Sequence, residues 1–199
     1  VLHTALVDMY AKCGVLTKAQ EIFDELHVKT IGTWNALISG YAQQGHGIEA
    51  IDCFKRMLGK GLPPDSVTYL CVLNACCHSS LVHEGQIYFE NMSEKYGLAP
   101  EIEHYTCMVE LFGRAGDFDK AMEVIRKMPS CDYPVWLSLL SSCEKWGNVR
   151  VGRLAFDEAI QLDHANGSAY ACMINLYLTA SMFEEANKIE AMKVKIIDL

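Results

Sequence analysis

The sequence lacks any run of eighteen or more apolar residues, although 51% of its 199 residues are hydrophobic. A helix that crosses a bilayer needs about 20 such residues in succession, so we expect no membrane partner. No two cysteines have the Cys-x-x-Cys spacing that is typical of zinc sites. The nine cysteines are therefore expected to be reduced structural thiols, buried at positions such as Cys13, Cys76 and Cys143.

Motifs for catalysis are also missing. The chain has neither the His-x-Glu nor the Pro-Cys-x-x-Cys element of a zinc deaminase. His83 and Glu84 are not followed by a second histidine at metalloprotease spacing, and no Gly-rich phosphate loop or nucleophile elbow is present. We therefore predict that the chain is not an enzyme and has no catalytic residue, metal ligand or cofactor.

Basic residues are too few for a protein that binds nucleic acid mainly through its phosphates. Asp and Glu number 25 against 17 Lys and Arg, so the formal net charge is −8. Affinity from phosphate neutralisation needs clustered positive charge. If RNA is the ligand, its bases must contribute more of the binding.

One ten-residue pattern recurs along the chain. Copies of it begin 31 to 36 residues apart, with a helix-like stretch after each. A period of this length is typical of a solenoid, in which stacked units bury one another's apolar faces. The copies are ALVDMYAKCG (5–14), ALISGYAQQG (36–45), CVLNACCHSS (71–80), CMVELFGRAG (107–116), SLLSSCEKWG (138–147) and CMINLYLTAS (172–181).

The apolar residues of each unit have helical spacing. Trp34, Leu37, Ile38 and Tyr41 fall on one face of a first helix. In the second helices a small residue recurs as Ala19, Ala50, Gly85, Ala121, Gly152 and Ala186. A bulky residue follows four positions later in most units, as expected where two helices cross closely. We predict an all-α fold, a right-handed solenoid of antiparallel helix pairs.

The chain resembles plant pentatricopeptide repeat (PPR) proteins of the PLS class, in which P, L and S variants of the repeat alternate. Three strings carry the resemblance: residues 34–41 (WNALISGY), 57–65 (MLGKGLPPD) and 104–116 (HYTCMVELFGRAG). A tetratricopeptide array is the nearest alternative. It expects Gly in place of Ile38 and Ala in place of Met57, and it does not explain the ending at Asp65.

The resemblance implies a division into typed repeats. PPR repeats occupy residues 1–132, as S-type 1–30, P-type 31–65, L-type 66–101 and S-type 102–132. Residues 133–199 resemble the paired E motifs of organelle editing factors, divided into 133–167 and 168–199.

The family binds single-stranded RNA with one base per repeat, selected by the fifth and last residues of each unit. The resemblance thus implies that Asn35 with Asp65 prefers uracil, and that Thr106 with Asp132 prefers guanine. The pair Thr4 and Thr30 occupies the same positions in the first unit but has no decoded base. Leu70 with Glu101 offers an apolar side chain and is assigned none.

A second-position aliphatic residue usually stacks on the base in such repeats. Val1 and Val67 stand at this position, whereas Gly32 and Glu103 replace it in the two units with decoded pairs. A plainer interpretation remains for the base-selecting residues. Asn35 caps a helix in that interpretation, and Asp65 stabilises the turn after Pro64. Thr106 and Asp132 admit the same interpretation.

The order of repeats and E motifs implies an adaptor for C-to-U editing of organellar transcripts in the chloroplast or mitochondrion. Through residues 133–199 it would recruit a DYW-type deaminase, in cis or in trans, and accessory editing factors. Two alternatives remain. One is an organellar PPR protein for RNA stability, splicing or processing, and the other is a tetratricopeptide-like scaffold that binds proteins.

Overall fold

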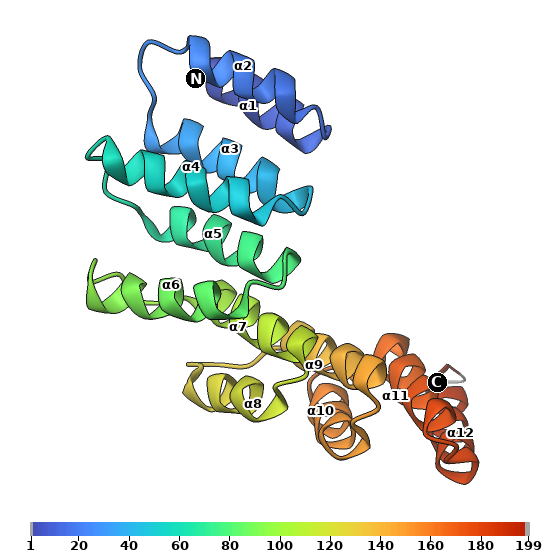
Figure 1. Ribbon diagram of the computed structural model, residues 1–199. Helices are drawn as coiled ribbons and strands as arrows, with labels where there is room; N and C mark the ends of the chain where they lie inside the picture. The colour runs from blue at the N-terminus through green and yellow to red at the C-terminus, as the bar shows by residue number, and fades with distance from the viewer. Residues whose placement is uncertain (1, 198–199) are drawn as a thin grey trace. The chain divides into compact units, whose positions relative to one another are not determined.

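The computed structural model describes the backbone of residues 2–197, which forms twelve α-helices and no strand (Figure 1). The helices are α1 Leu2–Lys12, α2 Leu16–Glu25, α3 Ile31–Gln43, α4 Gly47–Gly59, α5 Ser66–His78, α6 Val82–Glu94, α7 Ile102–Ala115, α8 Phe118–Lys127, α9 Tyr133–Trp146, α10 Val149–Leu162, α11 Gly167–Thr179 and α12 Phe183–Ile197. No helix within 2–197 is long and apolar enough to cross a membrane.

The helices form stacked pairs within two compact units, whose boundary lies inside α7 between Leu111 and Phe112. In the first unit α1 packs on α2, α3 on α4 and α5 on α6, and the first helices α1, α3 and α5 lie side by side (Figure 1). In the second unit α9 packs on α10 and α11 on α12, while α9 contacts α11. The predicted all-α stack of helix pairs is therefore confirmed.

Aromatic side chains join each pair to the next in the first unit. The Phe23 ring of α2 meets the edge of Trp34 of α3, with 4.6 Å between centroids. Phe54 of α4 makes the same kind of contact with Tyr69 of α5 at 5.7 Å. All four side chains are almost fully buried, and each such side chain contributes roughly 1.5–3 kcal/mol by leaving water.

The predicted small positions lie where helices cross. Ala19 and Ala50 are fully buried. A Cβ added to Gly85 would collide with Leu111 in the first unit, and one added to Gly152 would collide with Leu176 in the second. A side chain at either position would have to displace the leucine of the neighbouring helix, so glycine lets these helices pack closely.

All six copies of the recurring pattern end in the left-handed backbone region. Four of them end in glycine, with φ between 68° and 78°, and the other two end in Ser80 (φ 56°) and Ser181 (φ 59°). Each of these residues lies just after a first helix, where a positive φ turns the chain toward the second helix. The pattern is thus a repeated backbone conformation as well as a repeated sequence.

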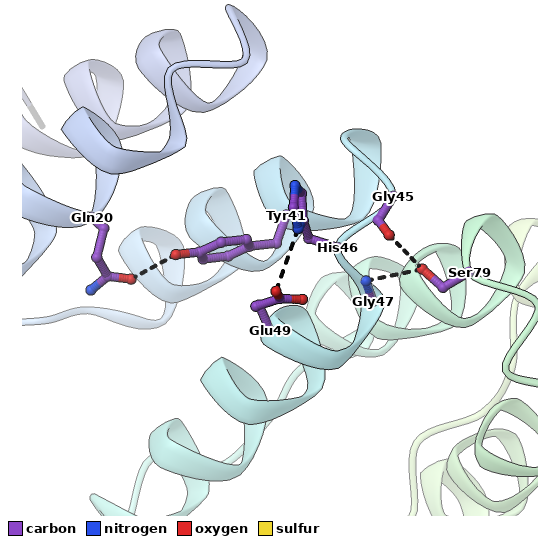
Figure 2. A network of polar contacts seen from close by, with 7 residues as sticks. All are labelled: Gln20, Tyr41, Gly45, His46, Gly47, Glu49 and Ser79. Carbon is purple, nitrogen blue, oxygen red and sulfur yellow. Dashed lines mark hydrogen bonds and ion pairs between the residues drawn. The ribbon is translucent and has the colours of Figure 1, made fainter.

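Polar contacts also tie successive repeats together. The Ser79 hydroxyl at the end of α5 accepts from the Gly47 amide (2.9 Å) and donates to the Gly45 carbonyl (3.0 Å), which holds the preceding turn (Figure 2). The Tyr41 hydroxyl of α3 donates to Gln20 of α2 at 3.2 Å. The contacts between neighbours are therefore directional as well as apolar.

The prediction for the cysteines is wrong at one position. Cys76 and Cys143 are fully buried, but Cys13 is exposed. The reason is that α1 ends at Lys12, so Cys13 lies in the turn before Gly14 and outside the packed helix face.

Candidate functional site

A groove with a volume of about 910 Å³ runs across the side-by-side helices α1, α3 and α5. It brings together Asn35, Asp65, Thr4, Thr30 and Val67, which the sequence pattern singled out, and Gly32. The remaining lining residues are Ala5, Asp8, Lys12, Ala36, Ser39 and Cys71. The candidate residues of the first two repeat junctions therefore share one surface.

Asn35 and Asp65 are linked to each other within this groove. The Asn35 Nδ2 atom donates to Asp65 Oδ1 at 3.2 Å, although the residues are 30 positions apart. The link exists because Asp65 is the N-cap of α5 and α5 packs directly on α3. The two predicted base-selecting residues of this junction are thus one hydrogen-bonded pair.

Thr68, in the first turn of α5, completes the pair into a network. Its hydroxyl lies 2.8 Å from Asn35 Oδ1 and 2.7 Å from Asp65 Oδ1, and its amide donates to Asp65 Oδ1 at 2.8 Å. The Thr68 side chain also accepts from the Asp65 amide at 3.3 Å, which makes a reciprocal capping box. Thr68 is fully buried, so this network fixes Asn35 and Asp65 from the protein interior.

The network favours the ionised form of Asp65. Burial alone raises the pKa of the Asp65 carboxyl, but hydrogen bonds from Thr68 and Asn35 outweigh this and hold the pKa below its usual value. The groove therefore carries a fixed negative charge beside the Asn35 amide.

Asn35 keeps hydrogen-bonding capacity for a ligand. An amide side chain has two N–H donors and two lone pairs on its oxygen. Asp65 takes one N–H, which assigns the orientation of the amide, and the single Thr68 hydroxyl proton is shared between Asn35 Oδ1 and Asp65 Oδ1. Asp65 and Thr68 occupy the edge on which the amide N–H and oxygen lie side by side, so one N–H donor of Asn35 remains for a ligand.

The plainer interpretation is wrong for Asn35, which does not cap its helix, and Asp65, expected to stabilise the turn after Pro64, is the N-cap of α5. The N-cap of α3 is Thr30, whose hydroxyl accepts from the Thr33 amide at 3.3 Å. Asn35 lies one turn further along and is only 8% exposed. Asp65 caps α5 and also contacts Asn35, so it has both roles.

The predicted stacking positions differ in what they offer. Val67 is 55% exposed and lines the groove. Val1 lies outside the described residues. Gly32 faces the groove with space around it, because an added Cβ would find its nearest neighbours, Thr30 and Thr4, at 3.9 Å.

The second decoded pair is divided between the two units, with Thr106 in the first and Asp132 in the second. Thr106 donates its hydroxyl proton to the Ile102 carbonyl of its own helix at 2.8 Å. Asp132 stands at the N-cap position of α9, and its side chain makes no capping hydrogen bond. The pairing of Thr106 with Asp132 remains a prediction.

At the junction of α5 and α7, His104 occupies the position that Thr68 has at the junction of α3 and α5. Its Nδ1 accepts from the Glu101 amide at 3.1 Å, so its Nε2 carries the proton and donates to the Ser66 carbonyl at 2.9 Å. The Ser66 hydroxyl donates to Glu101 at 3.1 Å. Glu101 is therefore held through its amide by His104 and through its carboxylate by Ser66, which fits a junction with no assigned base.

Sequence reasoning missed Thr68 and His104. Both stand three residues after the last residue of a unit, at the third position of the next helix. A polar residue at this position after Asp65 is a weak capping-box signal, since Glu or Gln is usual there. The signal gives no indication of the contact with Asn35 on another helix.

Comparisons with known proteins agree with the repeat architecture. Models described as PPR repeat match residues 1–31, 67–96 and 103–133, and a model described as PPR repeat family matches residues 29–78. The chloroplastic pentatricopeptide repeat-containing protein CRR2 of Arabidopsis thaliana is 40% identical over 188 residues, which cover 94% of this chain and 29% of CRR2. A mitochondrial pentatricopeptide repeat-containing protein of the same plant is 40% identical over 188 residues, which cover 92% of this chain and 27% of the relative.

The fold also matches a solved structure. The pentatricopeptide repeat protein PPR10 in complex with an 18-nt psaJ RNA element superposes with a TM-score of 0.81 at 21% sequence identity, over 100% of this chain and 30% of that one. At this identity the match shows the fold. The chain spans roughly a third of the length of the curated relatives it matches.

Proposed function

The chain belongs to the pentatricopeptide repeat family, and we propose that it is a sequence-specific adaptor that binds single-stranded organellar RNA, one base per repeat. A chloroplast or mitochondrial location is part of the proposal, since the relatives include one chloroplastic and one mitochondrial protein. The structure of PPR10 with an RNA element supports RNA as the ligand class.

The observation that carries the proposal is the preformed link between Asn35 and Asp65 at the floor of the groove. A single-stranded base is read by hydrogen bonds along its Watson–Crick edge. The edge of uracil has an N–H donor between two carbonyl acceptors. The free N–H of Asn35 can donate to one of these carbonyls, so uracil is the base proposed for this junction.

Val67 supplies the apolar contact in this arrangement. Its exposed side chain lies in the same groove as Asn35 and can cover one face of the bound base. Lys12, paired with Asp8 at 2.7 Å, is the one cation among the described residues that line the groove. Binding that depends on base contacts more than on phosphate contacts should weaken only slightly with salt.

The test replaces the Asn35 amide at the junction of α3 and α5 with a hydroxyl. Asn35→Thr with Asp65 retained should move the preference of this repeat from uracil toward guanine, and affinity for the original RNA should fall by about 1–2 kcal/mol because a hydrogen bond to the base is lost. Four RNAs that differ only at the base opposite this repeat are titrated by gel shift. The reciprocal control is Thr106→Asn, which should move its own repeat toward uracil.

An unchanged ranking of the four bases in Asn35→Thr, with the helical circular dichroism spectrum retained, would show that Asn35 does not select a base. The base ranking of Thr106→Asn at its own repeat then separates two explanations. A changed ranking means that only the register at Asn35 is wrong, and an unchanged ranking means that the recognition mode is wrong.

We further propose that the RNA-bound protein directs C-to-U editing and that the E-motif repeats recruit the editing machinery. The support is apolar surface on α10, where Leu154 is 42% and Leu162 is 53% exposed. A protein partner that covered these two side chains would remove their apolar surface from water. The partner in this proposal is a DYW-type deaminase or an accessory editing factor.

Point substitutions test this without removing a helix. Leu154→Glu with Leu162→Glu should abolish editing of the target transcript in a complemented mutant line, while RNA affinity in vitro stays unchanged. The matched control is Ile48→Glu, which places the same charge on an exposed residue of α4. If the double variant lost RNA affinity together with editing, α10 would be assigned to RNA binding or folding.

A further inference from the structure

A second, smaller pocket of about 350 Å³ lies beside the groove and is lined by His27, Lys29, Trp34, Lys60 and Leu62. Its walls come from the loop after α2, the first turn of α3 and the end of α4. No Asp or Glu is among the residues that line it.

The Trp34 indole that lines this pocket has an N–H group without an acceptor. Trp34 is 1% exposed, and its Nε1 is a buried polar atom with no hydrogen-bond partner. The edge contact with Phe23 and the Arg56 guanidinium, 5.6 Å from the ring centroid, hold the ring in place. A buried donor without a partner is unfavourable, so an acceptor that reached it would be stabilised; because Nε1 is almost inaccessible, the indole ring or the pocket wall must shift slightly when such a group binds.

Positive charge surrounds the same space. The Lys29 ammonium donates to the Asp24 carbonyl at 3.2 Å and to the Leu26 carbonyl at 2.8 Å, which leaves one of its three protons for another acceptor. Lys60 is exposed at the end of α4. The nearby Asp24 carboxylate lies 3.9 Å from Arg56.

We propose that this pocket binds a phosphate group. Donors on several walls suit a tetrahedral anion with oxygens pointing in different directions, and two lysines offset its charge. Two sources supply this chemistry, free orthophosphate and the backbone of a bound RNA. The second source is within reach of the groove because Thr30 and Asn35 line the groove, whereas their neighbours Lys29 and Trp34 line the pocket.

The indole proton itself reports on this site. In a ¹⁵N–¹H correlation spectrum of the full chain, the three tryptophans give three indole signals, and the Trp34→Phe variant identifies its own by the loss of one. Titration with inorganic phosphate should shift the Trp34 signal and leave those of Trp136 and Trp146 in place. Sodium chloride at equal ionic strength should shift none of the three.

Lysine variants test the charge. Lys60→Gln should weaken the apparent phosphate affinity by about tenfold, the scale of one charge-assisted hydrogen bond. Lys55→Gln, an exposed residue of the same helix outside the pocket, should not. Neither substitution touches the core, so folding is retained.

A parallel titration with a uridine-containing oligonucleotide separates the two sources. A Trp34 shift with inorganic phosphate alone assigns a free anion, and this arm does not depend on RNA binding. A shift that occurs only with the oligonucleotide assigns the RNA backbone. A Trp34 signal that moves in neither titration, or that moves together with the other two indoles in sodium chloride, overturns the proposal.

Discussion

The Thr68 hydroxyl lies 2.8 Å from the Asn35 side-chain oxygen, although 33 positions separate the two residues in the chain. One buried hydroxyl therefore joins α3 to α5. Thr68→Val keeps the shape of the side chain and removes this hydroxyl. It should lower the free energy of unfolding by about 1–3 kcal/mol, because it leaves buried polar groups unpaired.

Urea denaturation measures this loss, with two controls. Thr68→Ser keeps the hydroxyl and should lose less. Thr106→Val removes a hydroxyl that is bonded within its own helix and should also lose less. Equal losses in all three variants would mean that the link between helices adds nothing to stability.

Ser80 and Ser181 have a left-handed backbone conformation, so we expect replacement by glycine to stabilise the protein. Ser80 has a φ of 56°, a conformation that is unfavourable for any residue with a Cβ. Ser80→Gly should raise the free energy of unfolding by about 0.5–1 kcal/mol. The reverse change Gly45→Ser should lower it, because open space surrounds Gly45 and only its φ of 76° opposes a side chain. Thermal unfolding of the two variants should shift in opposite directions.

Acid should weaken the junction of α3 and α5. The pKa of Asp65 is lowered in the folded protein by hydrogen bonds from Thr68 and Asn35. Its contribution to stability is fully present above the unfolded pKa of about 3.9 and is lost as the pH falls through the lower, folded value. Urea unfolding from pH 6 downward should show a drop below about pH 4.

The Asp65→Asn variant isolates this drop, since its side chain does not titrate. The difference in stability between wild type and variant should shrink as the pH falls below about 4. A difference that stays constant through this range would contradict the assignment to Asp65.

The repeat architecture was predictable because it follows from local rules. Apolar spacing predicted the helix faces, and the small residues at Gly85 and Gly152 predicted the close crossings. The contact of Thr68 with Asn35 was not predictable, because periodicity does not tell which polar side chains meet across two helices. The unpaired indole of Trp34 was missed for the same reason, since the pattern identified only a buried aromatic residue. The exposure of Cys13 depends on where α1 ends, and helix ends are poorly determined by sequence.

A side chain added at Gly32 should increase the affinity for RNA. Its Cβ position is open, with neighbours at 3.9 Å, and it lies in the groove at the predicted stacking position. Gly32→Val should tighten RNA binding about fivefold, or about 1 kcal/mol, by adding apolar contact with the base. Gly59→Val, at an open site on α4 away from the groove, is the control. Fluorescence anisotropy with a uridine-containing RNA measures both, and equal affinities would show that no base stacks at Gly32.

The cysteines should differ sharply in reactivity. Burial raises the pKa of Cys71 to about 11 and that of Cys107 to about 12, so almost no thiolate forms at neutral pH. Cys13 is exposed. Iodoacetamide at pH 7.5 should modify Cys13 well before these two, as peptide mass spectrometry would show. Rapid labelling of Cys107 in the native protein would indicate that the junction of α5 and α7 opens readily.

Asp65 begins a helix and also holds the residue proposed to meet a base. A lineage that changes the base read at this junction must therefore keep a residue able to accept from the Thr68 amide, or lose the cap of α5. Caps of this kind contribute about 1 kcal/mol and are restricted mainly to Asp, Asn, Ser and Thr. The set of residues that evolution can place at position 65 is consequently small. It is limited by the need to form the helix, before any RNA is involved.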